Sequence, residues 1–441
     1  MSLSSVLRTT SKRAVRQVST SASLAEVFPS VPAGHATPLK SEVTVTETGK
    51  GLGLASASPA YATTSTLGVV FNTGARHESA KDAGISLLAA KMAFRATEAR
   101  SDLAVFREIE AIGGSISSAA GRDFVQWNIT VAPEYVGDAA AILAESLFAP
   151  RHADWDINTQ KDKVAVDIEL FHANAVELLA QGVHAGAFYD NRTLGRSIYA
   201  KDNLSKLNKK HLEAFYTENV TAQNLVLVGR NIAHSTLTDV ANTYFSTLPT
   251  GTKTLTTPAV YVGGEHRTVA ASAHAYVALG FSAGGALTGK DAHTAHVLEH
   301  LLNQRAGRAA TGFKATYSDA ALVGLSGVAK AGDASALTFN LLKEFQSFAQ
   351  APISAAELEG AKKASGLCYS SLVESKDGAL AELAKAAKTQ KADSSIFQGL
   401  AAVSSSDVQK LAEKLLASKP VLASVGDVSA VPRYDDILKK L

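Results

Sequence analysis

The segments KDAGISLLAAK at residues 81–91 and KDAHTAHVLEH at residues 290–300 decide the fold of this chain, because they are two copies of one pattern. Each copy follows an apolar run of the kind that forms a strand, TLGVVFNTG at 66–74 and AYVALGFSAGG at 275–285, and each opens a stretch with helical spacing of apolar residues. A strand and helix that recur in this way indicate an internal duplication.

The similarity between the two copies continues further along the chain. SISSAAGRDFV at 115–125 matches FKATYSDAALV at 313–323, and both segments are a polar turn that leads into a strand. Long Ala- and Leu-rich helices are expected at 133–149, 155–188, 334–349 and 355–388. Strands and long helices mixed in this order are typical of an α+β fold. The sequence therefore predicts two tandem homologous α+β domains.

A Thr-, Pro- and Gly-rich stretch that begins STLPTGTKTLTTP separates the two copies and indicates a linker. We therefore expect an N-terminal domain at 19–245, a linker at 246–266 and a C-terminal domain at 267–441. The chain of 441 residues is too long for one core of ordinary size, which agrees with two domains.

Residues 1–18 have the composition of a mitochondrial transit peptide. The basic residues of this segment are Arg8, Lys12, Arg13 and Arg16, and the first acidic residue of the chain is Glu26. Basic segments that lack acidic residues are typical of transit peptides, and the continuous apolar stretch of a secretory signal is missing. We expect cleavage after Val18; a merely basic tail is the alternative.

The composition excludes several classes of function. With 43 basic and 41 acidic side chains, the net charge of +2 gives no cationic field for nucleic acid. No apolar run reaches the ~18–20 residues that span a bilayer, so we expect no transmembrane segment. The single cysteine, Cys368, has no partner for an internal disulfide or a thiolate metal site, and we expect it to be a buried thiol.

A family resemblance is carried by an ordered series of segments. In the first half they are NTGARHES (72–79), KMAFRAT (91–97), IEAIGGSISSAAGRD (109–123), TLGRSI (193–198) and TAQNLVLVG (221–229). This half resembles the mitochondrial processing peptidase family, zinc proteases built from two copies of one α+β domain, and its inactive relatives, the core proteins of the cytochrome b-c1 complex.

The second half is similar to the core protein 2 branch of the same family. The segments that carry this similarity are FKATYSDAALVGL (313–325), SSLVESKDGALAELA (370–384) and SVGDVSAVPRYDDIL (424–438). The resemblance covers nearly the whole chain after the transit peptide. It implies that each domain is a mixed, mostly antiparallel sheet packed with helices, and that the two domains enclose a cavity.

The zinc site of the family does not survive in the first half. The family binds zinc through HxxEH on a helix, because His residues at i and i+4 share one face. This motif falls on Leu87, Ala90 and Lys91, and the third ligand and its supporting acid fall on Asp167 and Gln160. Leu and Ala have no lone pair, and an ammonium repels a dication. We therefore expect no catalytic or metal-binding residue here.

The second half contains a literal HxxEH at the equivalent position, His296-Val-Leu-Glu299-His300. One interpretation is a zinc site with Glu299 as general base; the other is a polar, partly solvated helix face. The spacing of the first copy places a third ligand at Lys376, or near Ser365 if the second copy is shorter, and neither is a carboxylate. The nearest carboxylates are Glu359 and Glu374. The second interpretation is favoured, and we expect no metal, cofactor or catalytic residue in the chain.

Single histidines and aromatic residues in the family-like segments have ordinary structural interpretations. His77 and His184 have no partner at ligand spacing, so we expect hydrogen-bonded structural histidines. Phe124 and Trp127 alternate with polar neighbours in an expected strand, which favours positions in the core or at an interface.

The resemblance implies a non-catalytic structural core subunit of the mitochondrial ubiquinol-cytochrome c reductase (complex III), needed for assembly and stability. Such a subunit pairs with core protein 1 and with other subunits of a complex that is itself dimeric. It lies on the matrix side of the inner membrane as a peripheral subunit, while other subunits carry out electron transfer. A family fold without its zinc ligands keeps large faces for such contacts.

Two alternatives remain open. One is the presequence-binding alpha subunit of the processing peptidase, which uses a glycine-rich loop in its second half. The segment LLNQRAGRAATGFKA at 301–315 contains no glycine cluster, which argues against this alternative. The other is an active zinc peptidase that uses His296, Glu299 and His300.

Overall fold

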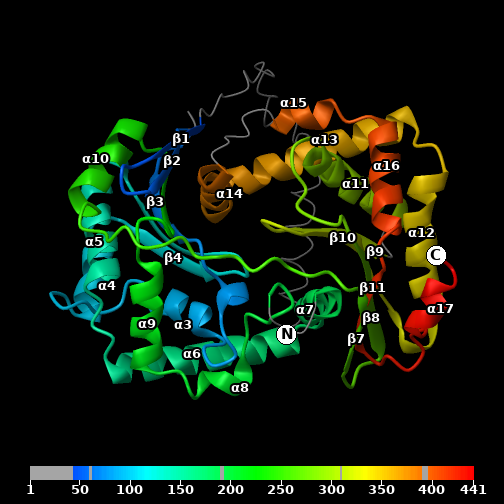
Figure 1. Ribbon diagram of the computed structural model, residues 1–441, viewed down its shortest axis with the longest axis horizontal. Coiled ribbons are helices and arrows are strands. Elements are labelled where there is room, and N and C mark those ends of the chain that lie inside the picture. The colour runs from blue at the N-terminus through cyan, green and yellow to red at the C-terminus, as the bar shows by residue number, and fades with distance from the viewer. Residues whose placement is uncertain (1–42, 59–61, 189–192, 308–309, 390–395) are drawn as a thin grey trace, which may run out of the picture. The chain divides into compact units, whose positions relative to one another are not determined.

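The computed structural model describes residues 43–58, 62–188, 193–307, 310–389 and 396–441 (Figure 1). The expected transit peptide, residues 1–18, lies outside the described residues. Among the helices of these ranges, none combines the length and the apolar character that a membrane span requires.

The first sheet contains six described strands. They are β1 (Val43–Glu47), β2 (Gly53–Ala57), β3 (Ser65–Phe71), β4 (Ser115–Ala120), β5 (Val125–Val131) and β6 (Leu225–Arg230). Their spatial order is β1-β2-β6-β3-β5-β4. Only β2 and β6 pair in parallel; the other neighbours are antiparallel. The sheet is therefore mixed and mostly antiparallel, as expected.

The second sheet repeats this topology. Its strands are β7 (Gly264–Val269), β8 (His274–Ser282), β9 (Ala310–Thr316), β10 (Ala321–Lys330) and β11 (Val421–Gly426). Their order is β7-β11-β8-β10-β9, with β7 parallel to β11 and the other neighbours antiparallel. When β1 is set aside, the two sheets agree in strand order and in every pairing direction. The internal duplication is confirmed.

The helices follow the same duplicated order. In the first half they are α3 (Ile85–Lys91), α4 (Asp102–Ala111), α5 (Val136–Phe148), α6 (Asp154–Ala173), α7 (Ala175–Ala187), α8 (Lys201–Leu204), α9 (Lys209–Asn219) and α10 (His234–Tyr244). In the second half they are α11 (Lys290–Ala306), α12 (Ala334–Gln350), α13 (Ala355–Glu374), α14 (Lys376–Thr389), α15 (Ile396–Ala401), α16 (Ser405–Leu416) and α17 (Tyr434–Leu438). Short 3-10 turns occur at Ala75–His77, Pro133–Tyr135 and Ala331–Asp333.

The two longest expected helices are each broken once, which corrects the prediction of single helices at 155–188 and 355–388. Asn174 separates α6 from α7, and its side chain accepts hydrogen bonds from the amides of Val176 and Glu177. Ser375 separates α13 from α14, and its hydroxyl accepts from the amide of Gly378. Both residues have extended backbone angles. Asn and Ser favour such caps because their side chains compete with the helical hydrogen bonds of the backbone.

These two breaks allow the halves to exchange a helix. α7, from the first half, packs on β7, β8 and β11 of the second sheet, whereas α14, from the second half, packs on β2 and β6 of the first sheet (Figure 1). The buried side chains on α7 are Leu179, Val183 and Ala187, against Ala278, Leu322, Val421 and Ala423. Those on α14 are Leu380, Leu383, Ala384 and Ala387, against Ala55, Val70, Val226 and Val228. Each sheet is thus covered in part by the other half.

The main cores lie between each sheet and its own helices. Trp127 is fully buried, and its ring contacts Phe71, Phe94 and Tyr216. Of the two positions expected for Trp127, the core or an interface, the structure shows the core. Cys368 corrects another expectation, because its side chain is exposed. α13 buries Leu358, Ala361 and Ser365, and Cys368 lies outside this buried set; residue type alone does not reveal which face of a helix is covered.

Candidate functional site

In the first half, the positions of the zinc motif lie on α3 and α6, two helices that pack together. Leu87 and Ala90 are buried in the apolar core. Lys91, the last residue of α3, places its Nζ 2.6 Å from Oδ2 of Asp167 on α6, with both side chains about one-third exposed, 36% and 34%. The spacing therefore brings the expected positions together, but they form an ion pair between an ammonium and a carboxylate.

The position of the supporting acid is occupied by Gln160, which is buried. Its Oε1 has no hydrogen-bond partner among the residues that the structure describes. An amide at this place carries no charge and cannot act as a general base, because its nitrogen and oxygen do not titrate in water's pH range.

In the second half, α11 carries His296, Glu299 and His300 on one face, opposite strand β9. Lys314 of β9 extends into this group. Its Nζ lies 2.5 Å from Nδ1 of His296 and 3.3 Å from Oε2 of Glu299. Only 9% of the Lys314 side chain is exposed. The ammonium of Lys314 thus contacts one candidate ligand, His296, and the candidate general base, Glu299.

The protonation states agree with this arrangement. Burial, together with the charge of Lys314, lowers the pKa of His296 to about 3. His296 is therefore neutral at pH 7, and its Nδ1 accepts a hydrogen bond from the ammonium. Burial also lowers the pKa of His300 and of Lys314, while the nearby Glu299 carboxylate opposes both shifts.

The expected places of a third ligand hold no carboxylate that reaches this group. Ser365 lies against α11, where its Oγ donates 3.2 Å to the carbonyl oxygen of His296. Lys376 begins α14. Glu359 pairs with Lys362 at 3.0 Å, and Glu374 is the last residue of α13. In the part of the chain that the structure describes, no three His, Cys, Asp or Glu side chains are grouped so that they could hold a metal ion.

The two single histidines are hydrogen-bonded structural residues, as expected. His77 Nδ1 accepts from the amide of Gly74, and its Nε2 lies 3.3 Å from the hydroxyl of Thr256. His184 bonds through Nδ1 to the carbonyl of Ala180 and through Nε2 to the hydroxyl of Tyr317, both at 2.7 Å. Burial lowers the pKa of His77 to about 4 and that of His184 to about 3, so both are neutral at pH 7.

Sequence reasoning missed an arginine that joins the two halves. Arg76 is buried, and its Nη1 lies 2.8 Å from Oδ1 of Asp123 in the first half. The same guanidinium binds both carboxylate oxygens of Asp319 in the second half, at 2.9 and 2.8 Å, and donates 3.0 Å to the carbonyl of Thr257. Both carboxylates lie within quoted family-like segments, yet nothing in their sequence spacing connects them. The buried arginine therefore joins the turn between β4 and β5, the turn between β9 and β10, and the linker.

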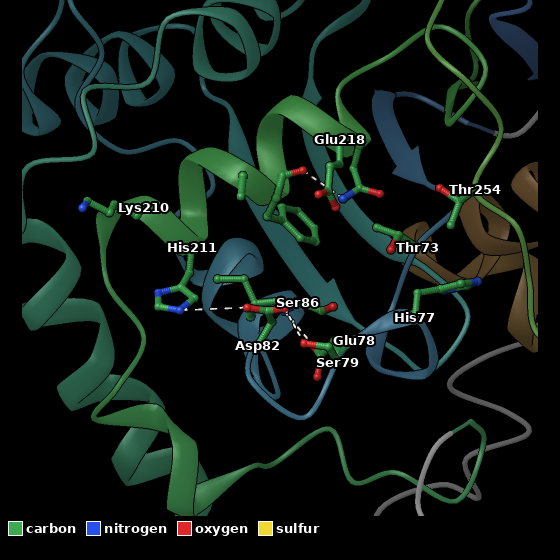
Figure 2. Close-up of a pocket in the computed structure, with 14 residues that line it drawn as sticks. Thr73, His77, Glu78, Ser79, Asp82, Ser86, Lys210, His211, Glu218 and Thr254 are labelled. Atoms are coloured by element: carbon green, nitrogen blue, oxygen red, sulfur yellow. Dashed lines mark hydrogen bonds and ion pairs between the residues drawn. The ribbon is translucent and has the colours of Figure 1, made fainter.

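A pocket of about 390 Å³ lies between the start of α3 and α9, and its lining includes His77, the residue that follows Arg76 (Figure 2). Its polar groups bond mainly to the protein itself. The buried carboxylate of Glu78 accepts from the amides of Gly84 and Ser86 at 2.7 and 2.9 Å, and burial raises its pKa. Asp82 accepts from Ser79 at 2.5 Å and lies 4.0 Å from Nε2 of His211. These contacts hold the segment that leads into α3.

Comparisons with known proteins agree with the duplicated fold. The chain matches the family model described as Insulinase (Peptidase family M16) over residues 54–202 and the model described as Peptidase M16 inactive domain over residues 206–365.

Individual relatives are similar over nearly their full length. The chain is 27% identical to the cytochrome b-c1 complex subunit 2 of Rattus norvegicus over 429 residues, 90% of this chain and 92% of the relative. It is 26% identical to the subunit of the same name in Schizosaccharomyces pombe over 395 residues, 85% and 90% of the two chains. It is 27% identical to the mitochondrial-processing peptidase subunit alpha of Solanum tuberosum over 432 residues, 91% and 84% of the two chains.

Proposed function

Because the chain belongs to peptidase family M16, we propose that it is a non-catalytic structural core subunit of the mitochondrial ubiquinol-cytochrome c reductase, complex III. The observation that carries this proposal is the pair of lysines at the family's motif helices. Lys91 pairs with Asp167 in the first half, and Lys314 contacts His296 and Glu299 in the second. Catalytic zinc needs three protein ligands and an open coordination position for water. A lysine ammonium has no lone pair and cannot be one of these ligands.

The similarity to subunit 2 of the cytochrome b-c1 complex directs the choice of complex. In this proposal the chain pairs with core protein 1 and contacts the membrane-embedded redox subunits from the matrix side of the inner membrane, as a peripheral subunit. Its role is in assembly and stability, while other subunits oxidise ubiquinol and reduce cytochrome c. Large faces of a duplicated fold suit it to such contacts once catalysis has been lost.

The alternative is the presequence-binding alpha subunit of the processing peptidase, and the similarity to the protein of that name in Solanum tuberosum favours testing it. Three residues separate the end of α11 at Ala306 from the start of β9 at Ala310. Such a short connection leaves little room for the glycine-rich loop that the alternative requires. An active peptidase that uses His296, Glu299 and His300 is disfavoured by Lys314.

The experiment that tests the proposal is native-gel separation of mitochondria extracted in mild detergent. The gel is probed for this chain, for cytochrome b and for the catalytic subunit of the processing peptidase, and zinc is measured in the recovered chain. We expect co-migration with cytochrome b and no stoichiometric zinc. Co-migration with the peptidase subunit alone would instead support the alternative.

A matched pair of variants separates adventitious zinc from a real site. His296→Ala removes a potential ligand, whereas His274→Ala removes a histidine at the exposed start of β8. Zinc that is stoichiometric in the wild type, lost in His296→Ala and kept in His274→Ala would overturn the non-catalytic proposal.

A further inference from the structure

The two sheets differ at one edge. In the first sheet, β1 pairs antiparallel along the outer edge of β2, from Val43 opposite Ala57 to Glu47 opposite Gly53. β7 is the strand of the second sheet equivalent to β2, since each lies parallel to the strand that returns after the long helices. Within the described ranges, no strand lies on the outer edge of β7. The duplication therefore leaves one position filled in the first copy and open in the second.

The backbone of β7 has free hydrogen-bonding groups along this edge. The amides of Gly264 and Ala270 donate to the carbonyls of Pro420 and Gly426, at the two ends of the ladder with β11. Because bonding alternates along a strand, Glu265, Arg267 and Val269 turn their amides and carbonyls away from β11. Among the described residues, these backbone groups have no hydrogen-bond partner.

The side chains of β7 do not close the edge. α7 packs against one face of β7. On the other face, the guanidinium of Arg267 donates to the carbonyls of Val431 and Pro432 and pairs with Glu265 at 3.1 Å. Strand side chains stand roughly perpendicular to the sheet, so they leave the peptide groups of the edge accessible in its plane.

Apolar side chains are exposed at the end of β7 and in the segment that precedes it. Val269 at the end of β7 is 80% exposed, and Val260 and Val262, just before the strand, are 60% and 42% exposed. A free edge with exposed valines is a template for pairing with another strand, and charged neighbours such as Glu265 and Arg267 are the usual protection against indiscriminate pairing.

We propose that the outer edge of β7 binds an extended segment of another subunit, which adds to the second sheet as an antiparallel strand. The filled copy shows the kind of occupant that fits: β1 is a short antiparallel strand with the sequence VTVTE, whose first four residues are all β-branched. Backbone hydrogen bonds supply the affinity in such β-augmentation, and alternate side chains supply the selectivity. The identity of the partner as a complex III subunit rests on the proposed function. The proposal that the edge of β7 binds an extended segment does not rest on it.

Hydrogen–deuterium exchange of the segment that contains β7 tests this proposal. The free full-length chain is compared with the same chain in the detergent-solubilised native assembly. In the free chain we expect the outward amides of Glu265, Arg267 and Val269 to exchange rapidly, because none of the described residues protects them. In the assembly we expect their exchange to slow by about tenfold or more, as for strand amides that open only rarely. Unchanged exchange of these amides in the assembly would overturn the proposal.

A matched pair of variants tests the role of the edge in assembly. Val269→Pro removes an outward N–H that does not serve β11, whereas Val269→Thr keeps the N–H and the β-branched shape. We expect Val269→Pro to enter the assembly about fivefold less than the wild type, because one edge hydrogen bond contributes about 1 kcal/mol. The melting temperature of the free Val269→Pro chain should be unchanged. Val269→Thr is expected to enter the assembly normally. The proposal is contradicted if Val269→Pro enters the assembly normally while the amides of Glu265 and Arg267 remain unprotected in that assembly.

Two further outcomes would show that a different segment occupies the edge, and either would overturn the proposal that another subunit binds there. Protection in the free full-length chain that disappears in a chain starting at Ser41 would identify the N-terminal residues of the same chain. Protection that grows with the concentration of the purified chain alone would identify a second copy. Failure of the proposed function can be distinguished from failure of the edge proposal. If β7 is protected in an assembly that lacks cytochrome b, the proposed function fails but the edge proposal stands.

Discussion

Nζ of Lys314 lies 3.3 Å from Oε2 of Glu299, so that a strand and a helix are joined by an ion pair within the only HxxEH pattern of the sequence. The ammonium of Lys314 supplies the positive charge that balances the carboxylate of Glu299. The contact is mostly buried on the lysine side, whereas 24% of the Glu299 side chain is exposed. This asymmetry predicts which partner is more costly to remove.

Glu299→Gln is expected to lower the free energy of unfolding by about 1–3 kcal/mol, because it leaves the buried ammonium of Lys314 without a counter-charge. Lys314→Met is expected to cost less, since Glu299 can turn toward water. Urea unfolding of the purified chain measures both. The control is Lys91→Met, which breaks a more exposed ion pair and is expected to cost less than about 1 kcal/mol. Equal losses in all three variants would contradict the argument from burial.

Removal of Arg76 is expected to weaken the junction between the halves. Arg76→Met leaves the carboxylates of Asp123 and Asp319 without the guanidinium that binds both, at an expected cost of about 2–4 kcal/mol. Arg76→Lys keeps the charge but loses the paired hydrogen bonds to Asp319, and about half of that cost is expected.

Urea unfolding checks this prediction, and a double-mutant cycle with Asp319→Asn isolates the contact across the halves. A coupling energy near zero between Arg76 and Asp319 would show that the guanidinium does not contribute to the junction.

The exchange of α7 and α14 predicts that damage in one half is felt in the other. Leu380 is fully buried on α14, within the cluster that covers the first sheet. Leu380→Ala is expected to cost about 2–4 kcal/mol through lost burial and a cavity. Although Leu380 belongs to the second half of the sequence, amides of β2 and β6 in the first half should exchange hydrogen faster.

The matched control is Leu367→Ala on α13, whose side chain is 73% exposed, with an expected change within about 0.5 kcal/mol. Faster exchange confined to the second half in Leu380→Ala would show that the helix exchange does not couple the halves.

Buried histidines predict a loss of stability in mild acid. Burial lowers the pKa of His184 to about 3 in the folded chain, whereas an unfolded histidine has a pKa near 6.5. Between these values the unfolded chain binds a proton that the folded chain does not, so stability falls as the pH falls from about 6.5 toward about 3, by about 1.4 kcal/mol per pH unit for each such histidine.

His184→Gln keeps polar groups near Ala180 and Tyr317 but removes the titration. Its unfolding free energy, measured by urea at about pH 5 and about pH 6, should depend on pH less steeply than that of the wild type by about 1 kcal/mol per unit. His77 and His296 keep their own lowered pKa values of about 4 and about 3, so part of the slope remains. An unchanged slope in the variant would contradict the prediction.

Much of the fold could be predicted from local patterns. The repeated segments around residues 81–91 and 290–300 gave the duplication, and the structure places α3 and α11 there in equivalent topology. The long helices were predicted without their breaks, because a single Asn174 or Ser375 has little effect on the apolar periodicity of a long window. Family spacing placed Lys91 and Asp167 at ligand positions, but their ion pair was not predicted, because it depends on the packing of α3 against α6.

The remaining contacts could not be found by reading along the chain. Lys314 is one lysine in a strand, and nothing in the local sequence shows that β9 aims it at α11. Cys368 was expected to be buried because of its residue type, yet the helix face that α13 covers excludes it. Lys314 is only 18 residues from His296, yet in both cases the packing of neighbouring elements, and not the local sequence, decides the contact.

The sequence by itself determined the duplicated α+β architecture and the side chains, Leu87, Ala90 and Lys91, that stand at the motif positions of the first half, because the spacing of apolar residues and the chemistry of each side chain are local properties. Only the tertiary structure decided that Lys314 stands beside His296 and Glu299, that α7 and α14 are exchanged, and that the edge of β7 is uncovered among the described strands. These features depend on which surfaces meet after folding, and burial and electrostatic pairing between distant residues are set by the three-dimensional packing of the whole chain.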